Sequence, residues 1–179
     1  MRELSLHILD VIENAIRADA SVISVTVSEK PKEDALEIVV EDNGPGFSAP
    51  PEQVLDPFYT TKKGKRTGLG LSLFQAAAEQ AGGSLTIGKS PLGGAAVKAV
   101  MQLNHIDRQP MGDLAATLSS VVCTNPHLDL RCRIISSNGD YVIRTSDVAK
   151  ELCVSDCCGL AVARRVSEQI KSRLASMHV

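Results

Sequence analysis

Two glycine-rich stretches combine bare backbone with charged side chains. The first, "EDNGPGF" (residues 41–47), places two acids and an amide directly before its glycines, and the second, "GKRTGLGL" (residues 64–71), carries a lysine, an arginine and three glycines. Glycine lets a backbone approach a ligand closely and present N–H groups to phosphate oxygens. The second stretch also opens an apolar helical pattern, and helix N-termini favour anions. Together the stretches indicate a site for a phosphorylated ligand, although neither matches the P-loop or the dinucleotide fingerprint.

A third candidate lies in the N-terminal segment. Residues 4–20 carry apolar residues at helical spacing, and His7, Asp10, Asn14 and Arg17 follow at intervals of three, four and three. These four side chains form one narrow polar stripe on a helix that is otherwise buried. Glu13 points to a different face, where we expect it to pair with Arg17.

The elements that must position these residues follow from periodicity and turn chemistry. Up to about residue 103 the order is helix, two strands, a long glycine-rich loop, helix and two strands, which predicts an α/β two-layer sandwich with one mixed sheet and helices on one face. The predicted segments are strands at 21–28 and 35–41, loop at 42–67 with one short helical turn, a helix at 69–83 and a hairpin at 84–103.

The composition changes after "NHIDRQP", and a second set of elements begins. We predict a helix over 111–122, strands over 128–135 and 140–145 around the turn "SNGD", and one or two further helices. The sequence therefore divides into residues 1–104 and residues 105–179. The second part is either a small α/β domain or an extension packed on the first.

Composition excludes several classes of partner. The 179 residues are 44% hydrophobic and 22% charged, with a net charge of −2 and no long basic block, which argues against nucleic-acid and anionic-membrane partners. No apolar run approaches the roughly 18 residues that a membrane span needs. Acids interrupt the apolar N-terminal stretch, so it does not resemble a signal peptide. Five cysteines, an odd number, fit free thiols in a reducing compartment, and we expect a soluble cytoplasmic protein.

Four motifs occur in a specific order: "DVIENA", "DNGPGF", "PFYTTK" and "GKRTGLGLSL". This order resembles the ATP site of the GHKL superfamily, which includes histidine kinases, type II topoisomerases, mismatch-repair ATPases and related chaperones. The resemblance covers residues 4–103, and "PFYTTKKGKRTGLGLSL" is most similar to bacterial histidine kinases. It implies the Bergerat-type ATP-binding fold, with ATP and Mg²⁺ as ligands.

The resemblance also implies a role for individual residues. Asp42 would accept a hydrogen bond from the adenine amino group, Gly44 and Gly46 would admit the ring, and Asn14 would coordinate Mg²⁺. Phe58 would help fix a lid over the nucleotide, and the lid residues 59–67 would become ordered when phosphates bind. The remaining implied phosphate contacts are the side chain of Lys62, with Lys63 or Lys65, and the backbone N–H groups of Thr67, Gly68, Leu69 and Gly70.

Two positions depart from the superfamily pattern. Asp10 stands one helical turn before Asn14, where hydrolytic members usually carry Glu as the base for water and many histidine kinases carry Asn. Asp is one methylene shorter than Glu, so its reach to an attacking water is reduced. The last strand usually begins with a Thr that joins the adenine water network, but here Ala95 and Ala96 stand at its start, which predicts weaker adenine binding.

These observations predict an ATP·Mg²⁺-binding protein that acts as a kinase component in trans or as a slow ATPase, with Asp10 as its catalytic residue. We see no sensor, transmembrane or dimerising phosphoacceptor segment before the motifs, so we do not expect a complete sensor kinase; we expect a protein partner. One alternative is a regulatory nucleotide-binding subunit without turnover. "HIDRQPMGD" (residues 105–113) is similar to small ATP-binding proteins of anaerobic bacteria found beside iron-hydrogenase and NADH-dehydrogenase-type subunits, which would make the partner a redox complex. Another alternative is a serine kinase of the anti-sigma-factor type.

Two further motifs carry weaker signals. "HIDRQP" (residues 105–110) echoes a histidine-kinase phosphoacceptor, but Ile106 stands where an acid normally follows the histidine, so we expect a polar connector. "LCVSDCCGL" places cysteines in a C-x3-C-C pattern, which does not match the paired spacing typical of zinc or iron–sulfur sites. We therefore expect ordinary thiols at Cys153, Cys157 and Cys158.

Overall fold

The computed structural model describes residues 2–56, 69–153, 159–175 and 177 of the chain. In chain order its elements are α1 (Leu4–Arg17), β1 (Val22–Lys30), the 3-10 turn η1 (Pro31–Glu33), β2 (Ala35–Asp42), α2 (Pro51–Val54), α3 (Leu69–Gln80), β3 (Ser84–Lys89), β4 (Ala95–Gln102), α4 (Leu114–Thr124), β5 (Asp129–Ser136), β6 (Gly139–Arg144), α5 (Thr145–Glu151) and α6 (Leu160–Leu174).

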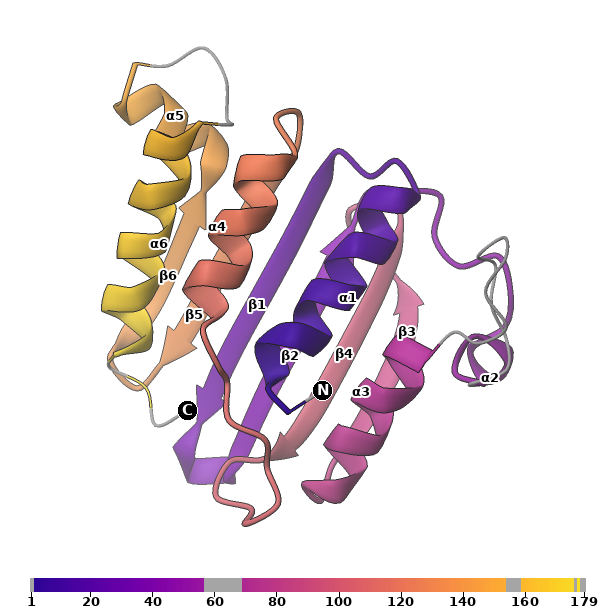
Figure 1. The fold of residues 1–179 in the computed structure, drawn as a ribbon. Helices are drawn as coiled ribbons and strands as arrows, with labels where there is room; N and C mark the ends of the chain where they lie inside the picture. The colour runs from indigo at the N-terminus through magenta and orange to yellow at the C-terminus, as the bar shows by residue number, and fades with distance from the viewer. Residues whose placement is uncertain (1, 57–68, 154–158, 176, 178–179) are drawn as a thin grey trace.

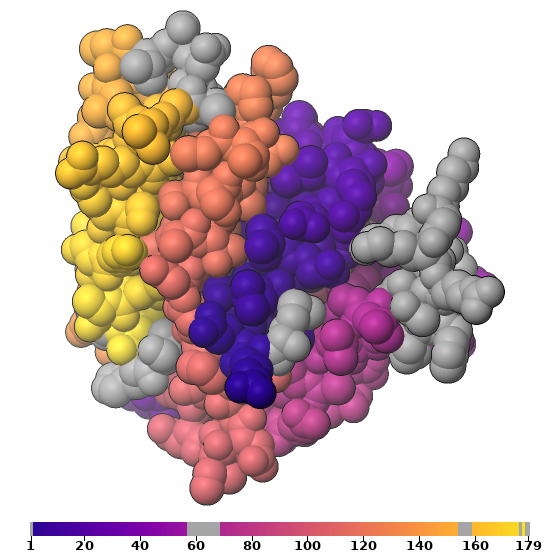
Figure 2. Space-filling model, viewed as in Figure 1, coloured from indigo at the N-terminus to yellow at the C-terminus, as the bar shows by residue number. Residues whose placement is uncertain are grey.

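The six strands form one mixed sheet in the order β3-β4-β2-β1-β5-β6. Helices α1, α3, α4 and α6 lie side by side on one face of this sheet (Figure 1). Seen from the helical side, they form a continuous layer of side chains (Figure 2). The predicted α/β two-layer sandwich with a mixed sheet and one helical face is confirmed.

The hairpin of β1 and β2 forms the centre of the sheet. The two strands pair antiparallel, with Ile23 opposite Asp42 and Val27 opposite Ile38. Alternate residues of both strands are buried against the helices, as period-two patterning requires. The burial of these aliphatic side chains beneath α1 and α3 fixes the register, and so fixes where the polar end of β2 emerges.

Helix α1 is held at both ends by contacts with other segments. The backbone N–H groups of Leu4 and Ser5 donate to the carbonyls of Pro110 and Met111, at 3.0 and 2.9 Å. The helix ends at Arg17, three residues earlier than predicted, because Asp19 adopts a left-handed conformation with φ of 58°. The connector after β4 therefore satisfies donors that a helix N-terminus leaves free.

The C-terminal elements continue the same two layers. Strand β5 pairs in parallel with β1, and β6 pairs with β5 as the edge of the sheet. Helix α4 starts at Leu114, later than predicted, because Gly112 has a φ of 73° and the Asp113 side chain caps the helix by accepting the Ala116 N–H at 2.8 Å. The domain boundary at residue 104 stays a prediction, while the sheet itself runs across it.

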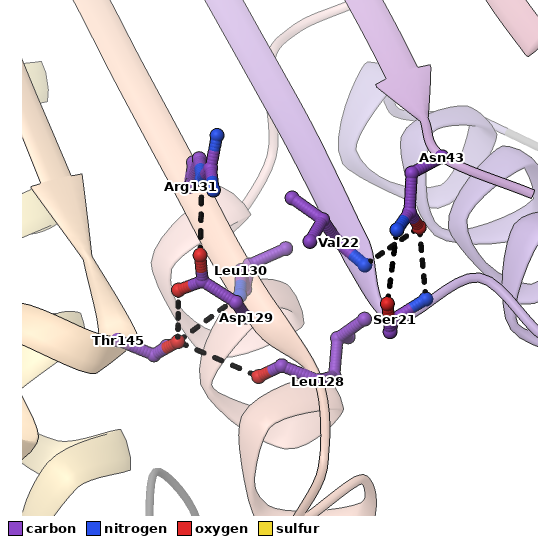
Figure 3. Close-up of polar contacts among 8 residues, drawn as sticks. All are labelled: Ser21, Val22, Asn43, Leu128, Asp129, Leu130, Arg131 and Thr145. Atoms are coloured by element: carbon purple, nitrogen blue, oxygen red, sulfur yellow. Dashed lines mark hydrogen bonds and ion pairs between the residues drawn. The ribbon is translucent and has the colours of Figure 1, made fainter. Parts of the chain in front are cut away.

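Side-chain hydrogen bonds tie the strand ends together at the edge where β2 finishes (Figure 3). The Asn43 side-chain oxygen accepts the backbone N–H groups of Ser21 and Val22, both at 2.9 Å, which joins the start of β1 to the end of β2. The buried Thr145 hydroxyl accepts the Leu130 N–H at 3.0 Å and so joins β5 to the start of α5. These contacts hold three chain segments in place beside the candidate site.

Candidate functional site

Asp42, the last residue of β2, is buried with 8% of its surface exposed. Its Oδ1 atom accepts the backbone N–H of Gly44 at 2.8 Å and that of Ala95 at 3.1 Å. In the described part of the chain no group donates to Oδ2. One oxygen thus fixes the orientation of the carboxylate, and the other is left to accept a hydrogen bond from a ligand.

The turn between β3 and β4 supplies a part of this site that the sequence did not reveal. Gly94 donates its backbone N–H to the Asp42 carbonyl at 3.1 Å, and a Cβ at Gly94 would lie 2.5 Å from the Gly44 nitrogen. Gly46, with a φ of 79°, faces the same glycine, since its own Cβ would lie 3.4 Å from the Gly94 oxygen. The paired glycines of "SPLGG" could have indicated this close approach to Asp42, but a hairpin turn accounts for them equally well.

Ala95 was expected to weaken the site because it replaces a threonine. Its backbone N–H nevertheless contacts Asp42 directly. The start of β4 therefore contributes through the main chain, which any residue except proline can do at this position.

The polar stripe of α1 runs from the Gly44 loop toward α3. Asn14 donates through Nδ2 to Asp10 Oδ2 at 3.3 Å, and its own Oδ1 accepts Arg17 Nη2 at 2.6 Å. Arg17 also pairs with Glu13 at 3.4 Å, as predicted. A Cβ at Gly44 would lie 3.3 Å from the carbonyl of Ala18, one turn beyond Asn14. The C-terminal end of the stripe thus lies beside the loop that follows Asp42.

Helix α3 closes the other end of the stripe. Gly70 lies so close to the Asp10 carboxylate that a Cβ on Gly70 would be 2.6 Å from Asp10 Cγ. One helical turn further along α3, Phe74 stacks on the His7 ring, with centroids 5.1 Å apart and 12° between the planes. The N-terminus of α3, where Leu69 begins the helix, therefore lies against Asp10.

His7 is a packed residue of the α1–α3 interface. Its ring is 1% exposed, Nε2 contacts the Gln109 side-chain oxygen at 3.1 Å, and Nδ1 has no partner in the described residues. Burial lowers the pKa of His7, while the hydrogen bond to Gln109 opposes this shift. This environment gives His7 a packing role between α1 and α3.

Some residues named in the sequence analysis lie outside the described part of the chain. They are the predicted nucleotide contacts Phe58, Lys62, Lys63, Lys65, Thr67 and Gly68, and the cysteines Cys157 and Cys158.

His105 lies at the opposite end of β2 from Asp42. Its neighbour Asn104 donates through both its backbone and side-chain nitrogens to Asp34 Oδ1, at the start of β2, whereas Asp42 is at the end of that strand. At about 3.4 Å per residue, the strand separates these ends by about 27 Å. The segment is not helical, and His105 Nδ1 accepts the Asp107 N–H at 3.1 Å. The predicted connector is what the structure shows.

The described residues include no group of three or more His, Cys, Asp or Glu side chains arranged to hold a metal. The oxygens of Asn14 and Asp10 are nevertheless of the kind that Mg²⁺ prefers, and Mg²⁺ is usually held by one or two protein groups together with nucleotide phosphates. Within the same residues, Cys123, Cys132 and Cys153 are free thiols. None of the described helices has both the length and the apolar character that a bilayer span demands.

Comparison with known proteins agrees with this geometry. Residues 2–105 match the family described as histidine kinase-, DNA gyrase B-, and HSP90-like ATPase. Sensor histidine kinase CpxA of Escherichia coli (strain K12) is 35% identical over 91 residues, which cover 48% of this chain and 20% of that protein. Sensor histidine kinase ZraS of Escherichia coli O157:H7 is 34% identical over 112 residues, covering 61% of this chain and 24% of that protein. The chain thus spans a fifth to a quarter of these relatives.

Among solved structures, the N-terminal domain of a DNA repair protein superimposes with a TM-score of 0.53 at 14% sequence identity, covering 80% of this chain and 52% of that chain. At this identity the likeness concerns the fold alone. The family match, in contrast, covers more than half of the 179 residues and includes Asp10, Asn14 and Asp42. This chain therefore belongs to the histidine kinase-, DNA gyrase B- and HSP90-like ATPases, and residues 2–105 are the part that matches the family.

Proposed function

We propose that this protein binds ATP with Mg²⁺ along the line from Asp42 to Asp10 and serves as a kinase component that acts on another protein, with slow hydrolysis at most when it is alone. The observation that carries the proposal is the arrangement of the Asp42 carboxylate. Oδ1 is held by two backbone N–H groups, and Oδ2 accepts nothing within the described residues. A buried acceptor placed in this way suits the exocyclic amino group of adenine.

The α1 stripe supports the phosphate end of the proposal. Asn14 Oδ1 and the Asp10 carboxylate are oxygen donors, and Arg17 contacts that same Asn14 oxygen at 2.6 Å. A Mg²⁺ ion bound at Asn14 would have to displace Arg17, whose guanidinium would then be free to pair with phosphate. The ion would neutralise phosphate charge, and the chain's own role would be to orient the nucleotide.

Two features support transfer to a partner over fast hydrolysis. The Asp10 carboxylate already accepts the Asn14 amide and lies against Gly70, which restricts the rotation that a short side chain needs to reach water. His105, the chain's own candidate acceptor, is at the opposite end of β2 from Asp42. The kinship with proteins named as sensor histidine kinases is consistent with a protein substrate.

A regulatory subunit that binds ATP without turnover is the second candidate, and the restricted Asp10 also favours it. The partner would then sense nucleotide binding, and a redox complex of the hydrogenase type is the partner we propose for this case. The two candidates share the same ATP site and differ in whether Asp10 can act on water.

The decisive experiment on the ATP site is Asp42→Asn. The two backbone donors require an oxygen at the Oδ1 position, so the substituted amide would place its NH₂ group where Oδ2 now stands, facing the adenine amino group donor to donor. An unpaired buried donor costs about 1–3 kcal/mol, or roughly a tenfold to hundredfold loss of ATP affinity. Glu41→Gln, on the opposite face of the same strand, is the matched control.

Calorimetry with ATP, ITP and GTP in the presence of Mg²⁺ provides the measurement. We expect the wild-type protein to prefer ATP, and Asp42→Asn to lose that preference because ITP carries an acceptor in place of the amino group. Equal affinity for ATP and GTP, unchanged by Asp42→Asn, would refute the adenine assignment.

A further inference from the structure

Strand β6 forms the outer edge of the sheet beside β5, so one side of its backbone has no strand next to it. A groove of 520 Å³ runs between this edge and α6, lined by residues of both elements. Figure 1 shows α6 alongside β6 on the helical side of the sheet. Free edges are sites where another strand can add, unless charge, brevity or cover prevents it.

The hairpin geometry determines which residues of β6 face outward through their backbone. Ser136 is paired with Gly139 across a two-residue turn, so these two residues form a hydrogen-bonded pair. Hydrogen-bonded and non-bonded pairs alternate along antiparallel strands. The backbone groups of Tyr141 and Ile143 therefore face β5, and those of Asp140, Val142 and Arg144 face the open edge.

The side chains of those three residues share one face of the sheet. Ile143 is buried, and the Tyr141 ring lies under the guanidinium of Arg173 from α6, at 4.1 Å, so both point to the helical side. Asp140, Val142 and Arg144 consequently point to the opposite side. Val142 is 53% exposed, which is unusual for a valine of a paired strand.

Asp140, Val142 and Arg144 are complementary to the same three residues of a second copy of the chain. In an antiparallel pair of two β6 strands centred on Val142, each Asp140 stands opposite the Arg144 of the other copy, and the two valines meet at the centre. The two Val142 residues would exchange both backbone hydrogen bonds, and each Arg144 N–H would reach the Asp140 carbonyl of the other copy. Opposite charges and apolar pairs at such cross-strand positions are stabilising.

Among the described residues, Arg144 has no counter-charge. Its cross-strand neighbour on β5 is Arg131, and no hydrogen bond or ion pair of the Arg144 side chain is found in the described residues. Arg131 is itself paired with Asp129 at 3.0 Å. Asp140 is bound by Arg133, but a carboxylate has further acceptor positions for a second guanidinium.

We propose that two copies of this chain associate through β6, joining their sheets across a two-fold axis at Val142, with Asp140–Arg144 pairs on either side. The two-fold axis perpendicular to the sheet keeps both helical layers on one side, so the two α6 helices lie over the new strand pair. The proposed nucleotide sites stay clear of the junction, because β1 and β5 lie between β2 and β6.

The test is a charge-reversal complementation measured by analytical ultracentrifugation over a range of concentrations. We expect the wild-type chain to show a monomer–dimer equilibrium. Arg144→Asp and Asp140→Arg each place like charges opposite one another twice per dimer, and each should weaken association about tenfold or more. In an equimolar mixture, the carboxylates of the first variant stand opposite the guanidinium groups of the second at both cross-strand positions, so the wild-type affinity should be recovered.

Lys32→Asp, which makes on η1 the same charge change as Arg144→Asp, is the control and should associate as the wild type does. Circular dichroism checks that each variant folds, since Asp140→Arg also loses its contact with Arg133. The proposal is overturned if the wild-type chain stays monomeric, in which case the β6 edge binds a strand of another protein or none. It is also overturned if both charge reversals leave the dimer intact, or if the equimolar mixture fails to recover the wild-type affinity.

Discussion

Gly94 and Asp42 fit together only because Gly94 has no side chain. The Gly94 N–H donates to the Asp42 carbonyl at 3.1 Å, and a Cβ on Gly94 would lie 2.7 Å from that same carbonyl oxygen and 2.5 Å from the Gly44 nitrogen. Both are backbone atoms, which cannot rotate away as the end of a flexible side chain could. The turn between β3 and β4 is therefore part of the adenine site that we propose at Asp42.

Gly94→Ala should consequently reduce ATP affinity by about tenfold or more, because the backbone around Gly44 must shift and the Asp42 carboxylate loses its orientation. Gly88→Ala is the matched control, since a Cβ at Gly88 meets nothing within 4 Å. Calorimetric titration with ATP and Mg²⁺ measures both. Equal losses in the two variants would show that the effect is not specific to Asp42.

Substitutions of Asn14 and Asp10 should have different effects on ATP binding and hydrolysis. We expect slow or absent ATP hydrolysis by the wild-type protein. Asn14→Ala should remove the Mg²⁺ dependence of ATP binding, because it deletes the oxygen that now accepts Arg17. Asp10→Asn should leave binding intact and remove whatever hydrolysis is present. A phosphate-release assay that finds strong activity surviving in Asp10→Asn would place the base elsewhere.

Asn43 should matter more for stability than its exposed position suggests. Its side-chain oxygen accepts the backbone N–H groups of Ser21 and Val22, and its nitrogen donates to Ser21 Oγ at 2.9 Å. We expect Asn43→Ala to lower the free energy of unfolding by about 1–2 kcal/mol. Ser21→Ala removes only the contact with Oγ and should cost less in urea unfolding. If Ser21→Ala lowered the unfolding free energy more than Asn43→Ala does, the backbone hydrogen bonds of Asn43 shown in Figure 3 would not be the main contribution.

The lowered pKa of the buried His7 predicts how stability depends on pH. The unfolded chain binds a proton at His7 more readily than the folded chain, so stability is lost as pH falls through the ordinary histidine pKa of about 6.5 and is fully present above it. His7→Phe, which keeps an aromatic ring against Phe74, should flatten the change in unfolding free energy between about pH 7.5 and about pH 5.5. The same slope in both proteins would assign it to another group.

His105 should carry no phosphate after incubation with γ-labelled ATP and Mg²⁺. Asp107 does approach the imidazole, with its carboxylate 4.0 Å from Nδ1, as the non-helical conformation allows. His105 nevertheless lies at the opposite end of β2 from Asp42, and we therefore expect no direct transfer. An acid-labile, base-stable label that disappears in His105→Gln would overturn this and identify a self-phosphorylating kinase.

Most of the helices and strands, and the candidate site residues, could be predicted from the sequence alone. Period-two runs such as "LEIVV" and the helical spacing of residues 4–17 are local patterns, and local hydrophobic periodicity is enough to predict strands and helices. The order of the four motifs was likewise readable along the chain, and it led to Asp42 and Asn14 before any contact between them and their surroundings was known.

Tertiary structure decided which segments meet. The contact of Gly94 with Asp42 joins residues far apart in sequence through the register of β2 against β4, and the parallel pairing of β1 with β5 joins the two halves of the chain. Neither pairing can be predicted from local hydrophobic periodicity, because an alternating strand buries the same face whichever strand lies beside it. Helix α1 ends where Asp19 turns and begins where residues 110 and 111 supply acceptors, and both limits depend on the packed chain around it.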